Sequence, residues 1–360
     1  MFKIEIKTIK GYKYVYLKDK VKVNGKYFTV SVYVGRLEKI SARKLTSKFI
    51  ELEKIKLKKY VDYRLKKYRH QHLDEKEATR IEILRYYYDQ FKEYYPDEVK
   101  RYEQAVFVRY VQGTTAIEGN TITPQQAEVL LEHGVVPAGK SVREVYEIKN
   151  FENLRRFLEK YEGDISEKLI KKMHEIIMQN LLESPGEYRR ISVSIEKADH
   201  EPPPAFEVPD LMKELVKWYK QNRKKMHPFE LAVLLHTKFV TIHPFVDGNG
   251  RVARALTNFV LERNGYPTLY LGLEHREQYL DAVAEGNEGN YKPIVKFMYD
   301  VYLEQHERIM ENVRNEIMKE AWGFFVKYTS IPDGIIKALK MEKLCRNNCG
   351  EVPHQTQEYP

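Results

Sequence analysis

The run from Ser41 to Gln112 contains no glycine and repeats its apolar side chains at helical spacing. Apolar residues three or four positions apart lie on one face of a helix, and glycine commonly follows a helix end, so this run predicts long helices. Glycines and prolines between Gly113 and Pro293 divide the next part into shorter helical segments. After Pro293 one amphipathic helix is expected to reach about Lys327. The chain is therefore predicted to be mainly α.

The first 38 residues follow a different pattern. Apolar and polar side chains alternate through residues 2–7 and in the runs that follow, which is the period-two signature of β-strands. Asn24-Gly25 separates two of these runs and is a strong hairpin signal, because both residues of such a turn take positive φ. A small β-meander over residues 1–38 is predicted.

These patterns divide the chain into four segments. They are a β-meander over 1–38, a helical region over 39–100, a core over 101–300 that carries the chemistry, and a C-terminal helix and tail over 301–360. Residues 188–195 alternate again between Pro185-Gly186 and Pro202. A β-hairpin is therefore expected to interrupt the helices of the core.

Composition narrows the class of protein. With 42% hydrophobic and 31% charged residues among 360, the chain has the make-up of a globular protein with a buried core. No stretch approaches the roughly 20 uninterrupted apolar residues that a membrane helix needs. Residues 1–7 lack the apolar segment of a signal peptide. A cytoplasmic protein without a membrane partner is expected.

Two features leave alternatives open. Cys345 and Cys349 are too few for a disulfide framework, and a zinc site that adds His354 lacks a fourth ligand, so free thiols are expected. Residues 54–69 carry eight lysines and arginines against one acid, Asp62. Such a helix could bind nucleic acid, which makes a nucleic-acid-associated regulator the alternative of a different class. A solvated helix face is the commoner meaning, so nucleic acid is not the expected partner.

A buried helix leads into the residues that carry the chemistry. Residues 229–240 are almost wholly apolar, which indicates a central helix in a helical protein. Pro244 disfavours helical geometry at His243 and so ends the helix there. The His243 imidazole is therefore expected on a turn at the end of a rigid element.

The loop after His243 has groups that can hold a polyphosphate. Glycines on both sides of Asn249 let successive N–H groups point into one anion-binding concavity, and the next helix begins near Arg251 with its positive end toward it. Arg251 and Arg254 share a helix face, and guanidinium groups match phosphate oxygens. Asp247 is an oxygen ligand of the kind that Mg²⁺ takes when phosphates fill most of its shell.

A histidine, a Gly-Asn-Gly turn or two arginines on a helix each commonly have a structural role alone. Their occurrence together within twelve residues is what favours a functional site. A calcium loop fails because Arg251 stands where a third oxygen ligand belongs. A zinc site of His236 and His243 lacks the i, i+4 spacing and the glutamate. One bound triphosphate, by contrast, could contact the His243 imidazole, a metal ion on Asp247, the glycine turn and both arginines at the same time.

The string from His243 to Arg254 resembles the signature of the Fic family, H-x-F-x-[DE]-G-N-G-R-x-x-R, at every fixed position. The resemblance covers roughly residues 100–300 and implies a mainly α Fic-type bundle with a β-hairpin flap. It also implies a protein adenylyltransferase, which moves AMP from ATP-Mg²⁺ onto a Ser, Thr or Tyr hydroxyl of a target protein.

The resemblance assigns roles within the motif. His243 would be the general base, Asp247 would hold Mg²⁺, and Arg251 and Arg254 would bind the β- and γ-phosphates. Phe245 is interpreted as the hydrophobic anchor of the loop. The nucleotide-binding residues implied by the motif are Gly248, Asn249, Gly250, Arg251, Val252, Ala253 and Arg254.

Further contacts follow from the same resemblance. The flap would pair with an extended target segment by β-augmentation, and an edge strand without function is the alternative. Tyr279 and Asn287 fall where the family contacts the adenine ring, while Leu280 stands where relatives often have a second tyrosine. The docking residues of the flap would be Ser192, Val193, Ser194 and Ile195.

A second motif, T-T-A-I-E-G at residues 114–119, matches the family's inhibitory pattern [ST]-x-x-x-E-[GN]. Thr114 and Glu118 share a helix face, and Gly119 can end the helix just after the acid. The resemblance implies that Glu118 pairs with Arg254 in the place of the γ-phosphate. The chain thus resembles the autoinhibited subclass with an N-terminal inhibitory helix, here near residues 105–119.

The resemblance leaves variants of the reaction open. Relatives remove AMP, or transfer UMP, phosphocholine or phosphate on the same site, although Gly250-Arg251 argues against the phosphate-transferring branch. A scaffold that is permanently held off is a further alternative. The expected partners are ATP, a target protein and, because family members often dimerise, a second copy of the chain. Self-modification is a further expected outcome.

Overall fold

The computed structural model describes residues 2–193 and 200–329. Five residues singled out in the sequence lie outside this part, namely Ser194, Ile195, Cys345, Cys349 and His354. The described chain is mainly α with one small sheet, as predicted.

Three strands and eleven α-helices make up the described chain. The strands are β1 (Lys3–Ile9), β2 (Tyr12–Val23) and β3 (Lys26–Arg36). The helices are α1 (Ala42–Lys67), α2 (Glu75–Tyr94), α3 (Pro96–Ala116), α4 (Pro124–His133), α5 (Val142–Glu159), α6 (Glu167–Ile177), α7 (Val208–Asn222), α8 (Pro228–Ile242), α9 (Asn249–Arg263), α10 (Arg276–Asn287) and α11 (Lys292–Thr329).

Residue contacts group the chain into two compact units. One consists of residues 1–64 together with the chain from 311 onward, and the other of residues 65–310. The boundaries fall inside α1 and α11. The first unit carries the sheet, and the second carries both motifs.

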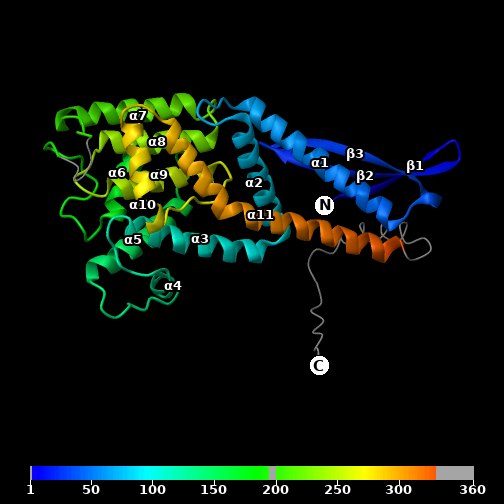
Figure 1. Cartoon of the computed structure of the whole chain (residues 1–360), viewed down its shortest axis with the longest axis horizontal. Coiled ribbons are helices and arrows are strands. Elements are labelled where there is room, and N and C mark those ends of the chain that lie inside the picture. The colour runs from blue at the N-terminus through cyan, green and yellow to red at the C-terminus, as the bar shows by residue number, and fades with distance from the viewer. Residues whose placement is uncertain (1, 194–199, 330–360) are drawn as a thin grey trace. The chain divides into compact units, whose positions relative to one another are not determined.

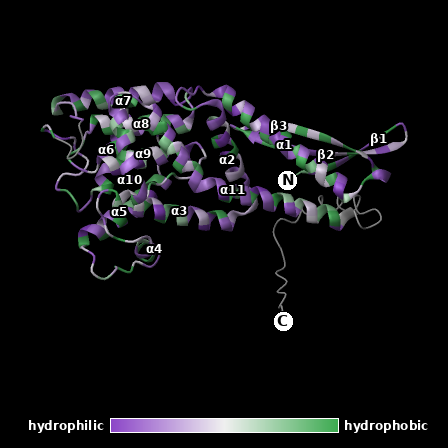
Figure 2. Cartoon of the chain, viewed as in Figure 1, coloured by the Kyte–Doolittle hydropathy of each residue, from purple (hydrophilic) through white to green (hydrophobic). Residues whose placement is uncertain are grey.

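The sheet of the first unit confirms the predicted meander. Its strands are antiparallel in the order β1-β2-β3. Asn24 and Gly25 form the turn between β2 and β3 with φ of 50° and 79°, which are the positive values that this dipeptide predicts. Hydrophilic and hydrophobic residues alternate along β2 and β3 (Figure 2), so one face of the sheet is apolar.

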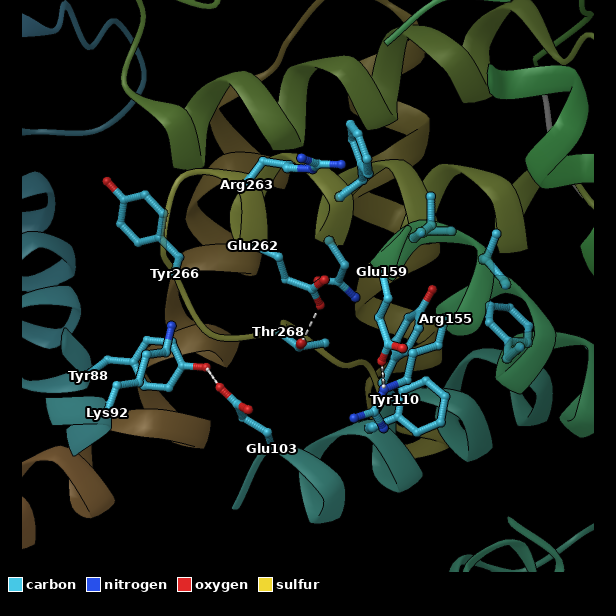
Figure 3. A pocket seen from close by; sticks show the side chains of 17 residues that line it. Tyr88, Lys92, Glu103, Tyr110, Arg155, Glu159, Glu262, Arg263, Tyr266 and Thr268 are labelled. Carbon is cyan, nitrogen blue, oxygen red and sulfur yellow. Dashed lines mark hydrogen bonds and ion pairs between the residues drawn. The ribbon is translucent and has the colours of Figure 1, made fainter. Parts of the chain in front are cut away.

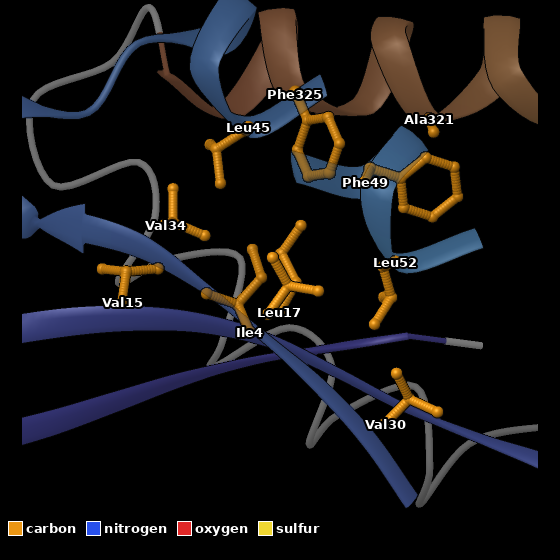
Figure 4. Packing of buried hydrophobic residues seen from close by; sticks show 11 residues of the cluster. Ile4, Val15, Leu17, Val30, Val34, Leu45, Phe49, Leu52, Ala321 and Phe325 are labelled. Atoms are coloured by element: carbon orange, nitrogen blue, oxygen red, sulfur yellow. The ribbon is translucent and has the colours of Figure 1, made fainter. Parts of the chain in front are cut away.

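One hydrophobic cluster covers that apolar face. Side chains from all three strands pack against Phe49 of α1 and Phe325 near the end of α11 (Figure 4). The C-terminal stretch of α11 therefore completes a core that the first residues of the chain begin. The buried members are Ile4, Val15, Leu17, Val30, Val32, Val34, Leu45, Phe49, Leu52, Ala321 and Phe325.

The basic run at residues 54–69 is only partly a surface feature. The Lys56 side chain is 4% exposed, and its ammonium lies between Asp19 and Glu53, at 2.7 and 2.8 Å from their carboxylate oxygens. Arg64 is also buried and donates to the side-chain carbonyl of Asn24 at 2.7 Å. Two of the eight cations therefore hold the helix to the sheet and are not available to a nucleic acid.

The second unit is built around α8 and α9. Eleven of the fifteen residues of α8 are buried, and so are twelve of the fifteen of α9. α8 contacts α7, α9 and α10, and α9 also contacts α3 and α6, which surround the central pair (Figure 1). This arrangement brings the end of α3 to the beginning of α9.

The expected hairpin at 188–195 is not borne out in its described part. Residues 188–193 contain no strand, and 194–199 lie outside the described residues. The backbone N–H of Arg189 donates instead to the Pro244 carbonyl at 2.9 Å, so the segment is held against the motif loop. Within the described residues, no helix has both the length and the apolar character needed to cross a membrane.

Candidate active site

The motif loop joins the end of α8 to the beginning of α9. His243 ends α8 in the left-handed conformation with φ of 49°, and Pro244 prevents the helix from continuing. Gly248, with φ of 81°, precedes the first turn of α9. The first N–H groups of a helix have no partner within the helix, so the amides that follow Gly248 form the expected anion-binding end.

Asn249 and Phe245 fix the shape of this loop. The Asn249 side-chain carbonyl accepts from the Phe245 N–H at 2.9 Å, and its amide donates to the Phe245 carbonyl at 2.8 Å. Phe245 is fully buried, as its interpretation as an anchor requires. The Asn249 side chain therefore serves the loop itself, and only its backbone remains for the anion contact that the sequence suggested.

His174 of α6 supports the loop from behind, and the sequence analysis did not find it. Its ring stacks on Phe245 with 3.7 Å between the ring centres. Its Nδ1 accepts from the Gly186 N–H at 2.7 Å, so Nε2 carries the proton and donates to the Asp247 carbonyl at 3.0 Å. Burial lowers the pKa of His174 to about 4, which keeps this neutral tautomer at pH 7. A buried histidine on an amphipathic helix gives no distinctive sequence signal.

Arg189 is a second residue that sequence reasoning missed. Its Nε donates to the His243 carbonyl at 2.8 Å, and its guanidinium also donates to the Pro203 carbonyl. Its side chain thereby ties the segment after Gly186 to the residue before Pro244. The only sequence signal for this role was a pair of arginines inside the predicted hairpin at 188–195, and that signal does not reveal what either arginine contacts.

The His243 ring is partly buried at the end of α8. Its Nδ1 is enclosed and makes no hydrogen bond within the described residues. Burial, followed by the nearby Arg189 guanidinium, lowers the pKa of His243 to about 4. The imidazole is therefore neutral at pH 7 and able to accept a proton.

Arg254 of α9 is held by the end of α3. Its Nη2 donates to Glu118 Oε1 at 2.6 Å and to the Thr114 carbonyl at 2.9 Å, and its Nε donates to Thr114 Oγ1 at 2.7 Å. The Arg254 side chain is 5% exposed and that of Glu118 is 31% exposed. The two motifs that lie 136 residues apart in sequence therefore meet through one ion pair.

The backbone at Gly250 shows how close this contact is. A Cβ atom at Gly250 would lie 2.7 Å from Glu118 Oε1 and 3.0 Å from Arg254 Nη1. The carboxylate thus lies directly over the second glycine of the motif, where an anion bound to the first turn of α9 would also lie.

Arg251 points to a different pair of acids. It donates to Asp247 Oδ1 at 3.1 Å and lies 3.5 Å from Glu147 Oε1 of α5. Arg143 approaches both acids, at 3.4 Å from Glu147 and 3.7 Å from Asp247. Glu147 and Arg143 were not found from the sequence, because i, i+4 pairs on a helix are common.

The remaining predicted residues are distributed unevenly. Tyr279 is 3% exposed, and its hydroxyl lies 2.9 Å from His236 Nε2 and 3.4 Å from Arg254 Nη1, so it supports the arginine. Asn287 accepts from Thr241 Oγ1 at 2.8 Å. The Val252 and Ala253 side chains are fully buried, which leaves only their backbone for a nucleotide.

The flap residues can be placed only in part. Ser192 is exposed and Val193 is half-buried, and neither lies in a strand. Their role as docking residues remains a prediction.

Known proteins resemble this chain in sequence and in fold. The sequence pattern described as the Fic/DOC family matches residues 164–261. A solved structure of Fic-1 from Caenorhabditis elegans is 30% identical, with a TM-score of 0.56, over 66% of this chain and 72% of that one. The chain belongs to the Fic/DOC family. A Fic-domain signaling protein from Bacteroides thetaiotaomicron has a TM-score of 0.59 at 26% identity, over 65% of this chain and 97% of that one.

Curated Fic relatives agree with this assignment. The protein adenylyltransferase Fic of Drosophila ananassae is 32% identical over 243 residues, which are 64% of this chain and 47% of the relative. The protein adenylyltransferase fic-1 of C. elegans is 35% identical over 196 residues, which are 52% of this chain and 38% of the relative. The chain thus spans less than half the length of these curated Fic proteins.

A cavity of about 330 Å³ lies away from the Fic motif. It adjoins the C-terminal half of α9 and is also lined by residues of α2, α3 and α5, including Tyr88, Glu103, Tyr110 and Glu262 (Figure 3). None of residues 243–254 lines it. This hollow is therefore separate from the site formed by His243, Glu118 and Arg254.

Proposed function

We propose that the chain is a protein adenylyltransferase that transfers AMP from ATP-Mg²⁺ to a Ser, Thr or Tyr hydroxyl of a target protein, and that Glu118 restrains it. One observation carries the proposal: a buried arginine of the motif is held by a partly exposed carboxylate directly over the glycine turn. Once the carboxylate moves away, the guanidinium of such an arginine can bind an anionic ligand. The names of the curated relatives support the reaction class.

The reaction requires a base beside the attacking hydroxyl. The hydroxyl oxygen forms a bond to the α-phosphorus, the bond from that phosphorus to the bridging oxygen breaks, and pyrophosphate leaves with the electron pair. His243 takes the hydroxyl proton, which its neutral ring at pH 7 allows. A positioned base typically contributes about 10²- to 10⁴-fold to such a step.

The phosphates need cations and N–H donors. Arg251 is proposed to bind the β-phosphate and Arg254 the γ-phosphate, while the amides after Gly248 bind oxygens at the start of α9. Each arginine already bonds a carboxylate, so each has an oxygen-binding geometry that a phosphate can take over.

The metal site fits Mg²⁺ that arrives with ATP. Within the described residues, no three His, Cys, Asp or Glu side chains gather into a ligand set, and Asp247 is the protein ligand that we propose. Its carboxylate is 41% exposed, and phosphates and water would fill the other positions, as Mg²⁺ prefers. The ion would neutralise charge on the α- and β-phosphates.

The restraint is a competition for Arg254. A γ-phosphate can reach this guanidinium only if the 2.6 Å contact with Glu118 is broken. ATP would then bind weakly, or with its α-phosphorus displaced from His243. Transfer is therefore proposed to be slow until Glu118 moves.

Target docking, assembly and location remain parts of the proposal. Ser192 and Val193 are exposed or half-exposed beside Arg189, which holds the segment at His243. An extended target segment could approach there. Self-modification, a homodimer, AMP removal by the same site and a cytoplasmic location remain predictions.

The test uses the purified chain with ATP labelled on the α-phosphate and Mg²⁺. Transfer of label to protein is expected for Glu118→Gly, and none for Glu118→Gly combined with His243→Ala. UTP and CDP-choline in parallel reactions identify other donors, and mass spectrometry locates the acceptor residue. Label transfer that survives His243→Ala would refute the assignment of the base. Transfer from another donor in preference to ATP would refute the AMP assignment.

A further inference from the structure

Positive charge is concentrated in the first unit. Residues 1–64 contain 18 lysines and arginines and six acidic residues, a net charge of +12. The whole chain carries +9, so residues 65–360 sum to −3. Such an asymmetry points to a polyanionic partner for the N-terminal segment.

The sheet of this unit has one face covered by helices and one face exposed. Ile4, Leu17 and Val32 point into the cluster shared with α1 and the end of α11. The side chains that alternate with them are tyrosines, cations and hydroxyls. We call this the tyrosine face, formed by Tyr12, Tyr14, Tyr16, Tyr27, Tyr33, Lys3, Lys7, Lys18, Lys20, Lys22, Arg36, Thr29, Ser31 and Glu5.

The strand register arranges these side chains in rows. Tyr16 pairs with Tyr33, and their ring centres are 5.4 Å apart. Lys18 pairs with Ser31 and Lys20 with Thr29 in the next rows. Aromatic rings and cations on this face thus recur at every second residue, which is about 6.6 Å along a strand that rises about 3.3 Å per residue.

Several of the rings are open to solvent. Tyr27 is 65% exposed, Tyr12 is 49% exposed and Tyr33 is 48% exposed. Cations lie over two of these rings, since the Arg36 guanidinium carbon is 4.1 Å from the centre of the Tyr12 ring and Lys22 Nζ is 5.7 Å from that of Tyr27. Glu5 is the only acid on the face, and it lies 3.8 Å from both Lys7 and Lys18. The face therefore combines apolar planes with a surplus of positive charge.

We propose that the tyrosine face binds single-stranded RNA, with bases stacked on the exposed tyrosines and phosphates contacting the neighbouring lysines and Arg36. Aromatic platforms beside cations are the general means of binding single strands, because every base has a planar face. An acidic peptide would use the lysines but would bring no planar bases to stack on the exposed tyrosine rings. This surface is separate from the site proposed for nucleotide transfer, and its function does not depend on that reaction.

One feature favours RNA over DNA as the ligand, and another favours the sheet over α1 as the binding surface. Thr29 and Ser31 are exposed between the cations and can bond a ribose 2′-hydroxyl, which DNA lacks. In α1, by contrast, Lys56 and Arg64 are buried and bonded to Asp19 and Asn24. The basic helix therefore offers less to a nucleic acid than its sequence indicates.

The test measures fluorescence anisotropy of a labelled 12-nucleotide single-stranded RNA with the full chain at several salt concentrations. Tyr12→Ala with Tyr33→Ala is expected to weaken binding at least about tenfold, since each stacked base contributes to affinity. Lys18→Glu with Lys20→Glu is expected to lower the salt slope by about 1.4, at about 0.7 per phosphate contact of a single strand.

Matched controls come from the second unit. Lys217→Glu with Lys220→Glu changes two exposed lysines of α7 by the same charge, and Phe206→Ala removes an aromatic side chain that is 80% exposed. Neither is expected to change RNA binding by more than about twofold. Thermal unfolding of each variant establishes that the sheet remains folded.

Three outcomes would overturn the proposal. Equal losses in the α7 lysine control would show that binding follows net charge alone. Duplex RNA of the same length binding as tightly as the single strand would exclude stacking. The DNA strand of the same sequence binding equally would refute the assignment to RNA, because the proposed hydroxyl contacts would then contribute nothing.

Discussion

Replacement of Glu118 tests the most specific contact in the structure. The pair between Glu118 Oε1 and Arg254 Nη2 at 2.6 Å is a charge-assisted hydrogen bond, a class that contributes about 1.5–3 kcal/mol. If ATP must break this hydrogen bond to bind productively, its affinity is lowered by roughly 10- to 150-fold, because RT is about 0.59 kcal/mol. Because the Glu118 side chain is 31% exposed, solvent screens the pair and the lower end is expected. Glu118→Gly should therefore raise kcat/KM for ATP in AMP transfer about tenfold or more.

The contacts of Arg254 also predict how other variants should compare with Glu118→Gly. Arg254 keeps both contacts with Thr114 after the change, so the guanidinium stays in place to receive a phosphate. Glu118→Gln retains a hydrogen-bonding oxygen without the charge and should give a smaller rise than Glu118→Gly. Glu132→Gln, an exposed acid of α4, is the control and should give none.

The assay is transfer of α-labelled AMP to protein across a range of ATP concentrations, with ATP affinity measured in parallel by calorimetry. Glu118→Gly combined with Arg254→Ala should not show the rise in kcat/KM, because that rise requires Arg254 to bind the γ-phosphate. Unchanged kcat/KM in Glu118→Gly, with ATP bound as in the parent chain, would refute the competition. A gain that survives Arg254→Ala would refute the role of that arginine.

Three further predictions concern stability. A Cβ at Gly113 would lie 2.1 Å from the Leu271 carbonyl oxygen, so Gly113→Ala should lower the free energy of unfolding by roughly 1–3 kcal/mol. Gly323→Ala, which meets nothing within 4 Å, should not, and equal melting temperatures for both would contradict this. Lys56→Met removes a buried ammonium from between Asp19 and Glu53 and should cost about 3–5 kcal/mol in chemical denaturation; a loss below about 1 kcal/mol would show that the pairs contribute little. Burial lowers the pKa values of three histidines of the second unit to about 3–4 in the folded chain, namely His174, His236 and His306. In the unfolded chain these pKa values return to about 6.5. The free energy of unfolding should therefore be highest above pH 6.5 and should fall on acidification below it by about 1.4 kcal/mol per histidine and pH unit. Urea unfolding at pH 7 and pH 5.5 measures that loss, and pH-independent stability between these values would refute it.

Much of the fold was predictable because the relevant signals are local. Alternation and Asn24-Gly25 predicted the meander, and the glycine-free run predicted helices. Pro244 and Gly248 predicted the turn between α8 and α9, because each restricts or permits backbone conformations by itself. The pairing of Glu118 with Arg254 came from resemblance and not from spacing, and the structure has it as an ion pair.

The remainder depends on contacts between distant parts of the chain. Nothing in residues 311–329 indicates that Phe325 packs beside Ile4 and Val15, because an amphipathic helix does not specify what covers its apolar side. Lys56 looked like a surface charge, since its two carboxylate partners are visible only after folding.

The hairpin predicted at 188–195 has no strand in its described part, residues 188–193, for a related reason. Alternation predicts a strand only if another strand is available to pair, and the Arg189 N–H bonds the Pro244 carbonyl instead. Asn249 was assigned to the anion by the family resemblance, and the structure shows in addition that its side chain bonds the Phe245 backbone. Short polar side chains in loops commonly bond the nearby backbone, and a motif does not reveal that use.

The backbone of His243 has a practical consequence for trapping complexes. A left-handed conformation costs a residue with a Cβ about 1–2 kcal/mol and costs glycine almost nothing. Replacing this histidine with glycine thus removes the proton acceptor while relaxing the loop, whereas alanine keeps the strain. His243→Gly is accordingly the better choice for capturing ATP and an unmodified acceptor together, as a stalled assembly suited to crystallisation.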